Sequence, residues 1–270
     1  MKIKKLGNFD LLRFKVFVCF LCSTIVYGQE KKSDIPEMVT DRPDVTESSK
    51  VMPKGYLQVE TGGFYESSTD GQTSEKWVYN TSLVRYGILD NLELRLGWDL
   101  GQEKLNMGDQ NSKELLNGFS PLLIGAKVSI TEEEGALPEI ALLGHLFLPF
   151  LASSDFRPRT TGVDFSFAFS HSLNERSDFS YNLGVEWMDG SPEAIYIYSL
   201  AYGYSLTDNF GAYAELYGGF PENDKAGHFC DMGITYLLRR NIQLDAYIGT
   251  GISKGQDFLL GAGFSFRVPN

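Results

Sequence analysis

A G-x-S-x-G motif and three histidines are the residues of this chain whose types and spacing could support catalysis. Gly251-Ile252-Ser253-Lys254-Gly255 matches the motif of serine hydrolases, in which the serine lies on a turn from a strand into a helix. Strand-like segments lie on both sides of it here, which favours a hairpin loop. A barrel enzyme acting on lipid would instead need one histidine beside one serine in its wall, and the sequence leaves that alternative open.

Metal chemistry has little support in the sequence. His145, His171 and His228 fall on different segments, with none of the spacings typical of metal ligands. The acidic run from Glu132 to Glu134 could attract a divalent cation, but an acidic, solvated turn is the better explanation. We therefore expect no catalytic residues, no metal and no cofactor.

The charge of the chain limits its partners. The formal net charge of the 270 residues is -11, and a basic stretch at the start makes the remainder more acidic still. An acidic chain is a poor binder of nucleic acid, because the phosphate backbone repels it.

The first 28 residues have the character of a signal peptide. Met1 to Lys15 is basic, Val16 to Val26 is apolar, and Val26-Tyr27-Gly28 is an acceptable cleavage site. A membrane anchor would need roughly 20 apolar residues, and this run has only about half that number. The mature chain is expected to start at Gln29 and to keep only Cys230, which allows no internal disulfide.

From Gly55 onward the chain alternates between apolar and polar residues with a period of two, as β-strands do. No later segment could cross a bilayer as a helix, so a membrane location would require a closed barrel. We predict an all-β, up-and-down antiparallel transmembrane β-barrel over residues 55–270. About twelve strands are expected, close to 55–66, 76–88, 91–101, 118–130, 139–150, 160–171, 178–188, 194–206, 209–219, 227–237, 241–252 and 256–268.

The connections between these segments alternate in length, as they do in outer-membrane barrels. Those after the even strands are short and rich in turn residues, such as Leu89-Asp90-Asn91, and those after the odd strands are mostly longer and more polar. An even number of strands then places both ends of the barrel on the short-turn side, which in such proteins is the periplasm.

One face of each segment is apolar and the other polar, and a membrane barrel turns its apolar face outward. In 178–188 the apolar side chains of Phe179, Tyr181 and Leu183 alternate with Ser180 and Asn182. Aromatic residues gather near the strand ends, as headgroup belts require. A soluble β-sandwich would hide the apolar face instead and would not need detergent.

The same alternation assigns an acidic lumen. The expected inward-facing acids are Glu60, Glu66, Glu93, Asp99, Asp164, Glu186, Glu215, Asp231, Asp245 and Asp257, against the bases Arg95, Lys127 and Arg267. The phase of 76–88 is ambiguous around Arg85. An acidic lining would favour cations or polar neutral solutes. Alternatively, these charges pair with one another and side chains fill the lumen.

Residues 29–54 contain Pro36, Pro43 and Pro53, many charges and no periodicity. This composition predicts an extended, polar periplasmic leader ahead of the barrel.

A motif spans the boundary between this leader and the first strand. It reads Asp41-Arg42-Pro43-Asp44, then Thr46-Glu47-Ser48-Ser49, then Pro53-Lys54-Gly55-Tyr56, followed by Gln58 and Glu60. It resembles the opening motif of the bacterial outer-membrane family named for the MetA pathway of phenol degradation, whose members are often called transporters. The resemblance implies a β-barrel that passes solutes, and it names no substrate.

Together these features predict a channel-like barrel in the outer membrane of a Gram-negative bacterium, exported by its signal peptide. Its expected partners are outer-membrane lipid, the barrel-assembly machinery and a small solute of unknown identity, without nucleic acid. A structural or adhesive barrel with a filled lumen is the alternative, and a lipid-acting barrel enzyme is a further one.

Overall fold

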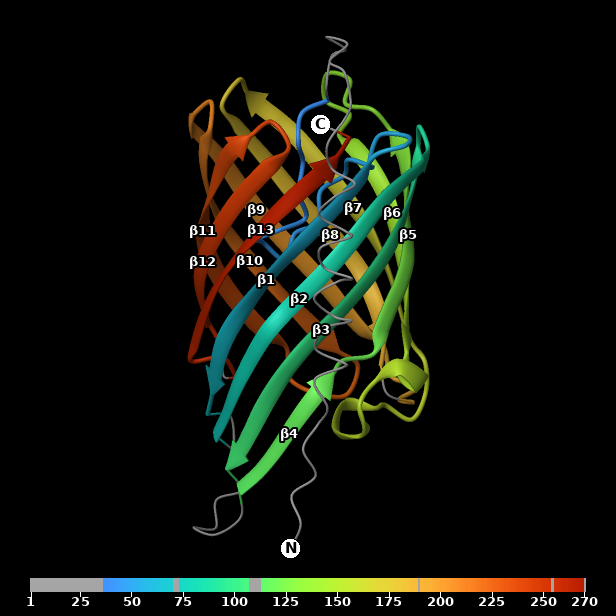
Figure 1. Cartoon of the computed structure of the whole chain (residues 1–270), viewed down its shortest axis with the longest axis vertical. Coiled ribbons are helices and arrows are strands. Elements are labelled where there is room, and N and C mark those ends of the chain that lie inside the picture. Colours follow the sequence, from blue (N-terminus) through green and yellow to red (C-terminus); the bar gives the residue numbers. More distant parts are fainter. Residues whose placement is uncertain (1–35, 70–72, 107–112, 189, 254, 270) are drawn as a thin grey trace, which may run out of the picture. The chain divides into compact units, whose positions relative to one another are not determined.

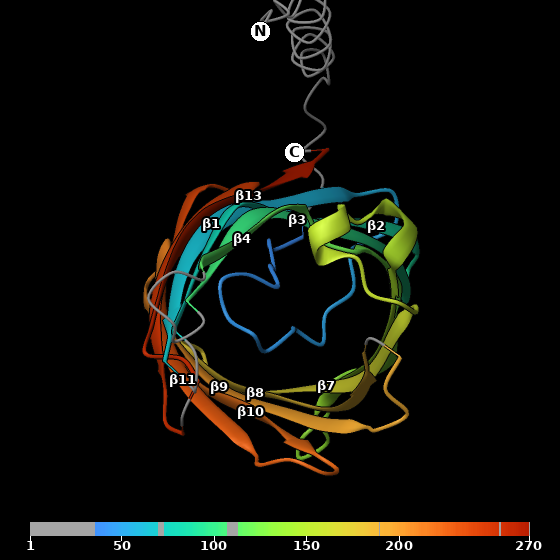
Figure 2. The same ribbon diagram turned by 90° about the horizontal axis from the view of Figure 1, so that it is seen from below.

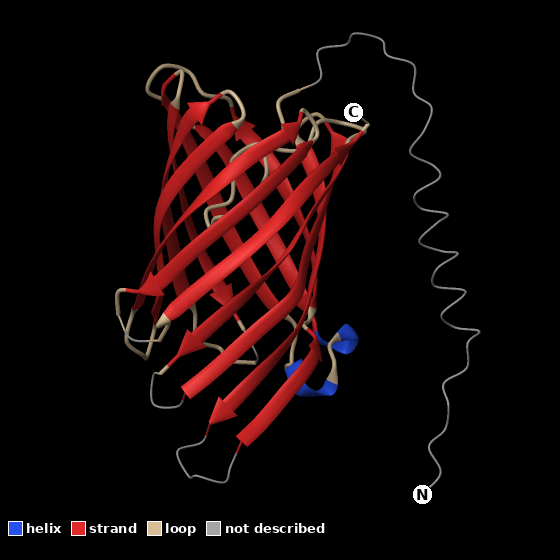
Figure 3. Cartoon of the chain, turned by 60° about the vertical axis from the view of Figure 1, so that its left-hand side comes forward, coloured by secondary structure: helices blue, strands red, loops and turns tan. Residues whose placement is uncertain are grey.

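The computed structural model describes residues 36–69, 73–106, 113–188, 190–253 and 255–269. Strands make up most of this part of the chain (Figures 1 and 3). In chain order they are β1 (Leu57–Ser68), β2 (Thr73–Leu89), β3 (Leu92–Asn106), β4 (Lys113–Phe119), β5 (Leu122–Thr131), β6 (Glu139–Leu148), β7 (Gly162–Asn174), β8 (Ser177–Trp187), β9 (Ile195–Thr207), β10 (Phe210–Pro221), β11 (Gly227–Arg239), β12 (Ile242–Gly251) and β13 (Phe258–Val268). Two short 3₁₀ helices, η1 (Pro149–Leu151) and η2 (Ser154–Phe156), follow β6.

The strands form one closed antiparallel sheet. β1 pairs with β2 on one side and with β13 on the other, so the first and last strands complete the ring that Figure 2 shows. β4 and β5 both pair with β3, at residues 100–106 and 92–97 respectively, and together occupy one position in the wall. The predicted up-and-down antiparallel barrel of twelve strands is therefore confirmed.

The connection between the third and fourth strands differs from the expectation. Residues 102–117 were expected to be a loop, but β3 continues to Asn106 and β4 begins at Lys113. The sequence of β4 does not alternate between apolar and polar residues, since Leu115 and Leu116 are adjacent. Backbone pairing with β3 extends the two strands beyond the rest of the barrel (Figure 1).

The outer surface of the barrel is apolar, as predicted. Leu183 is 51 % exposed on the outside of β8, whereas the neighbouring Asn182 is 7 % exposed on the inside. Leucine, isoleucine, phenylalanine and tyrosine side chains are exposed in the same way along the other strands. No helix in the described part of the chain is long and apolar enough to span a bilayer.

The two ends of the barrel are unlike. β1 begins and β13 ends at the same end, where tight turns such as that between β2 and β3 lie; we call this the short-turn end (Figure 1). The opposite end, which we call the long-loop end, carries the β3–β4 extension and the connection that contains η1 and η2.

Candidate functional site

Residues 37–54, which we call the inserted segment, lie inside the barrel. Figure 2 shows this part of the chain as a blue path enclosed by the strands. Its backbone and side chains bond to strands on several sides of the wall, among them β1, β2, β8, β10 and β12. The prediction of an extended leader outside the barrel is therefore wrong for residues 37–54, and residues 29–35 lie outside the described part of the chain.

Asp41 anchors this segment to one wall. Its Oδ2 atom lies 3.1 Å from Nη1 of Arg85, 2.8 Å from Nη1 of Arg95 and 3.0 Å from Nζ of Lys127. The three cations come from β2, β3 and β5, which are neighbours in the barrel. All four side chains are buried, so the barrel presents three desolvated positive charges to one carboxylate of the inserted segment.

Two glutamates of the wall complete this network. Glu93 bonds to Nη2 of Arg85 at 2.9 Å and to Nη1 of Arg95 at 3.0 Å. Glu60 bonds to Nη1 of Arg85 at 3.0 Å and accepts a hydrogen bond from the Asp41 backbone N–H at 2.9 Å. Buried charges are tolerated only when they are paired and hydrogen-bonded, and here each has several partners.

The network holds the Asp41 carboxyl in its charged form. Burial alone would raise the pKa of Asp41, but the charges of Arg85, Lys127 and Arg95 outweigh burial and hold that pKa well below its usual value. The attachment of the inserted segment at this point is therefore electrostatic.

Arg42 attaches the segment to a second wall. Its Nη2 atom lies 3.0 Å from Oδ1 of Asp245 on β12, and its guanidinium lies 6.0 Å from the ring centre of Tyr247. Gly62 on β1 and Gly263 on β13 are directly opposite one another in the register, and a methyl group on either would overlap the guanidinium. Glycine at both positions therefore leaves room for Arg42 against the wall.

The next residues cross to the far side of the barrel. Glu215 on β10 accepts hydrogen bonds from the backbone N–H of Val45, at 2.8 Å, and from the hydroxyl of Thr46. Burial raises the pKa of the Asp44 carboxyl well above its usual value, and the charges of Glu215 and Asp231 raise it further. Asp44 is thus in the opposite situation to Asp41, because it faces acids and not bases.

The backbone of Glu47 bonds to a side chain of β8, the amide of Asn182. Its backbone N–H donates to Oδ1 of Asn182 at 2.7 Å, and its carbonyl accepts from Nδ2 of the same amide at 2.9 Å. Its carboxylate lies 2.6 Å from Nη2 of Arg95. Further along, the Met52 N–H donates to Glu93 at 2.7 Å.

Part of the inserted segment separates two cavities. Asp44, Thr46 and Ser48 line a cavity of about 380 Å³ toward the short-turn end. Val45 and Glu47 line a cavity of about 440 Å³ toward the long-loop end. Successive residues of an extended chain point in opposite directions, so residues 44–48 form a partition one chain thick.

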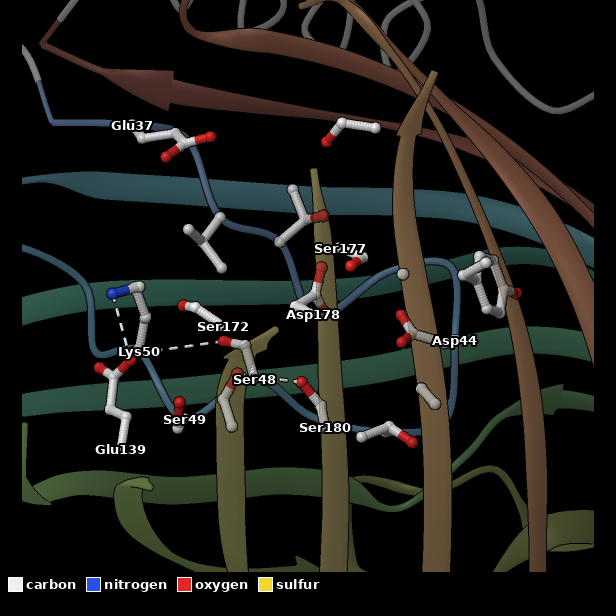
Figure 4. Close-up of a pocket in the computed structure, with 18 of the residues that line it drawn as sticks. Glu37, Asp44, Ser48, Ser49, Lys50, Glu139, Ser172, Ser177, Asp178 and Ser180 are labelled. Atoms are coloured by element: carbon white, nitrogen blue, oxygen red, sulfur yellow. Dashed lines mark hydrogen bonds and ion pairs between the residues drawn. The ribbon is translucent and has the colours of Figure 1, made fainter. Parts of the chain in front are cut away.

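Hydroxyl groups dominate the cavity at the short-turn end. Figure 4 shows Ser48 of the inserted segment together with Ser172 of β7 and Ser177, Asp178 and Ser180 of β8 in this lining. An ion pair of 3.1 Å between Lys50 and Glu139 lies at its edge. The lining is polar and well suited to water or hydroxylated solutes.

Aromatic rings and carboxylates line the cavity at the long-loop end. Tyr217 and Phe229 stack with their ring centres 5.4 Å apart, and Asp164 and Glu186 reach the same cavity from β7 and β8. His145 bonds to Asp164 through Nδ1 at 2.8 Å.

Most of the predicted luminal charges do point inward, although they are not equivalent. Seven of them bond to the inserted segment: Glu60, Glu93, Arg95, Lys127, Glu215, Asp245 and Arg267. Asp231 is buried on β11 directly opposite Glu215. Asp164 and Glu186 line the cavity at the long-loop end. Glu66 and Asp99 lie nearer that end than Glu60 and Glu93, and the alternation of β1 and β3 places them on the inner face.

The assignment of Asp257 to the lumen is wrong. Asp257 precedes β13, is exposed, and accepts a hydrogen bond of 2.7 Å from Thr69 in the neighbouring connection. The alternation of β13 does not extend to this residue, because the strand begins only at Phe258.

Arg85 is the main omission of the sequence reasoning. It is fully buried and contacts three acids, but a bulge in β2 near Asn80 obscured the phase of that strand. The pairing of β2 with β3 would have pointed to it, because Arg85 and Arg95 lie directly opposite one another there. Two facing cations require an anion from elsewhere, and Asp41 supplies it.

The motifs considered for catalysis have structural roles where they are described. Gly251 ends β12, and Ile252, Ser253 and Gly255 lie in the connection to β13, with no helix among the described residues that follow Ser253, as the hairpin interpretation predicted. Glu133 accepts two hydrogen bonds from Ser172, each of 2.7 Å. Among the described residues no group of three or more histidine, cysteine or acidic side chains is placed to hold a metal ion.

Several solved barrels are similar to this chain. The COG4313 outer membrane channel from Pseudomonas putida F1 superposes with a TM-score of 0.63 at 14 % identity, over 81 % of this chain and 97 % of that one. The NanC porin gives a TM-score of 0.51 at 12 % identity, over 77 % of this chain and 98 % of that one. At these identities the likeness concerns the fold. No curated protein matches the sequence.

The family model of the MetA pathway gives the classification. It matches residues 40–268 and therefore covers both the motif in the inserted segment and the whole barrel. The chain belongs to the family described as "Putative MetA-pathway of phenol degradation".

Proposed function

We propose that this barrel passes small polar or cationic solutes across the outer membrane, along a path beside the inserted segment. The partition carries the proposal: a single extended chain at residues 44–48 separates a cavity of about 440 Å³ from one of about 380 Å³. The likeness in fold to a channel and a porin supports it. A small movement of so thin a partition would join the cavities.

The charges that remain unpaired support a preference for cations. Glu60, Glu93 and Asp245 are neutralised by arginines, so they contribute little to a field in the lumen. Glu186 and Asp178 line the two cavities, and no ion pair found in the described part of the chain includes either of them. A cavity lined by carboxylates concentrates cations.

Val45 offers a test of the path. Its side chain is 51 % exposed inside the barrel, and only its backbone N–H bonds to the wall. Val45→Trp should at least halve the single-channel conductance in planar bilayers, and Val45→Gly should raise it. Leu200→Trp, on the lipid-facing side of β9, is the matched control and should leave conductance unchanged.

Two outcomes would contradict the proposal. A purified, folded barrel without conductance would favour a structural role, and equal conductance in all the Val45 variants would show that solutes do not pass the inserted segment.

A further inference from the structure

The cavity toward the long-loop end contains an electrostatic conflict that the fold does not resolve. His145 on β6, Asp164 on β7 and Glu186 on β8 are successive cross-strand neighbours in the register, so their side chains form one row across the inner wall. Asp164 and Glu186 lie directly opposite one another. Like charges at directly opposite positions of a sheet are destabilising unless something neutralises them.

His145 contacts only one of the two acids in this row. Its Nδ1 atom bonds to Asp164 at 2.8 Å, and no ion pair in the described part of the chain includes Glu186. His145 is only 6 % exposed, and its Nε2 atom has no hydrogen-bond partner among the described residues. Gly125 makes space for this ring, since a methyl group there would overlap it.

Aromatic side chains line another part of the cavity wall. Tyr217 and Phe229 come from β10 and β11, and Phe147 comes from β6. Tyr217 and Phe229 stack with their ring centres 5.4 Å apart. A volume of about 440 Å³ lies within the range of pockets that hold small organic molecules.

We propose that this cavity binds a small organic ammonium ion with an aromatic or apolar body. The ammonium group would lie against Asp164 and Glu186 and relieve their repulsion, and the body would pack on Tyr217 and Phe229. Aromatic faces attract cations as well as apolar groups, so both parts of such a ligand fit. An organic anion would meet two carboxylates. This inference rests on the proposed function, because it names the class of solute that the channel would take.

Calorimetry on the full-length barrel in detergent tests the inference with phenethylammonium as the probe. Phenylacetate is the matched anion, and methylammonium tests the contribution of the body. We expect phenethylammonium to bind at least tenfold more tightly than either. Asp164→Asn combined with Glu186→Gln should weaken it at least tenfold, whereas Glu103→Gln combined with Asp257→Asn, two acids outside the cavity lining, should not.

Folding is checked separately for every variant by heat-modifiable migration on gels. If the double variant is unfolded, Glu186→Gln alone takes its place, with the same expected direction. Equal affinity for phenylacetate, or undiminished affinity in the folded Asp164 and Glu186 variant, would overturn the inference. Calorimetry measures binding without ion flow. Such a result would therefore not decide the proposed function, which the conductance experiment tests separately.

Discussion

At the scale of single residues, two aspartates three positions apart in one motif have opposite surroundings. Asp41 faces Arg85, Arg95 and Lys127, whereas Asp44 faces Glu215 and belongs to an acidic cluster. The chain alone gives no reason to treat them differently. Their roles follow from the strands that the fold places beside them.

Asp41→Asn should destabilise the barrel by about 3–5 kcal/mol at pH 7, because it removes the common partner of three buried cations. Urea unfolding followed by tryptophan fluorescence would measure the loss. Lys50→Ala is the control: Lys50 is 60 % exposed in its ion pair with Glu139, and such pairs contribute at most about 1 kcal/mol. An unchanged unfolding midpoint in Asp41→Asn would refute the role of this carboxylate.

The stability that Asp41 contributes should also depend on pH. The pKa of its carboxyl is lowered in the folded protein, so this stability is present above the pKa of an unfolded aspartate and is lost as the pH falls through the folded pKa. The difference in stability between the protein and Asp41→Asn should therefore narrow only in strong acid.

Asp44→Asn should act in the opposite direction and stabilise the protein at pH 7, by up to about 1 kcal/mol, because it removes a repulsion from Glu215. The pKa of the Asp44 carboxyl is raised in the folded state, so folding takes up a proton and stability falls as the pH rises from the unfolded toward the folded pKa. In Asp44→Asn this decline should disappear. Unfolding curves of the unmodified protein and of Asp44→Asn, measured between pH 4 and pH 8, test this. Destabilisation by Asp44→Asn would contradict the placement of Asp44 among acids.

At the scale of elements, the alternation of each strand predicts which face meets lipid. Leu183→Arg, on the outer face of β8, should cost roughly 2–4 kcal/mol and impair assembly. Ser180→Arg on the same strand points into the cavity at the short-turn end and should be tolerated. Membrane fractionation and urea unfolding would measure both effects. Equal damage from the two changes would show that the phase of β8 is wrong.

The elements also show what sequence reasoning could and could not reach. The predicted strands are all present because alternation is local, but β4 was missed because Leu115 and Leu116 do not alternate. The inserted segment was misplaced for a different reason. An extended polar segment has the same local sequence pattern in water and in a lumen. The residues that hold Asp41 inside the barrel, such as Lys127, lie far from it in the sequence.

At the scale of the whole molecule, the acidic residues of the lumen fall into two groups. Glu93 and Asp245 hold the inserted segment through ion pairs with arginines. Replacing these two acids by amides would therefore loosen that segment. Asp164, Asp178 and Glu186 line the cavities and are the acids that a passing ion would meet. Selectivity is therefore best tested on the second group alone.

Asp164→Asn, Asp178→Asn and Glu186→Gln combined should shift the reversal potential in a potassium chloride gradient toward zero. The shift should be larger at low ionic strength, because screening is then weaker. Asp257→Asn, at the exposed rim, is the control and should have a smaller effect. An anion-selective unmodified barrel would refute the electrostatic argument and leave the fold untouched.

The glycine pair beneath Arg42 has a consequence for the order of assembly. Gly62 belongs to the first strand of the barrel and Gly263 to the last, so the surface on which the guanidinium rests exists only after those two strands have met. The bond from Arg267 to the carbonyl of Glu37 likewise requires the last strand. Residues 37–54 precede every strand in the chain, yet they can complete their native contacts only when the ring closes.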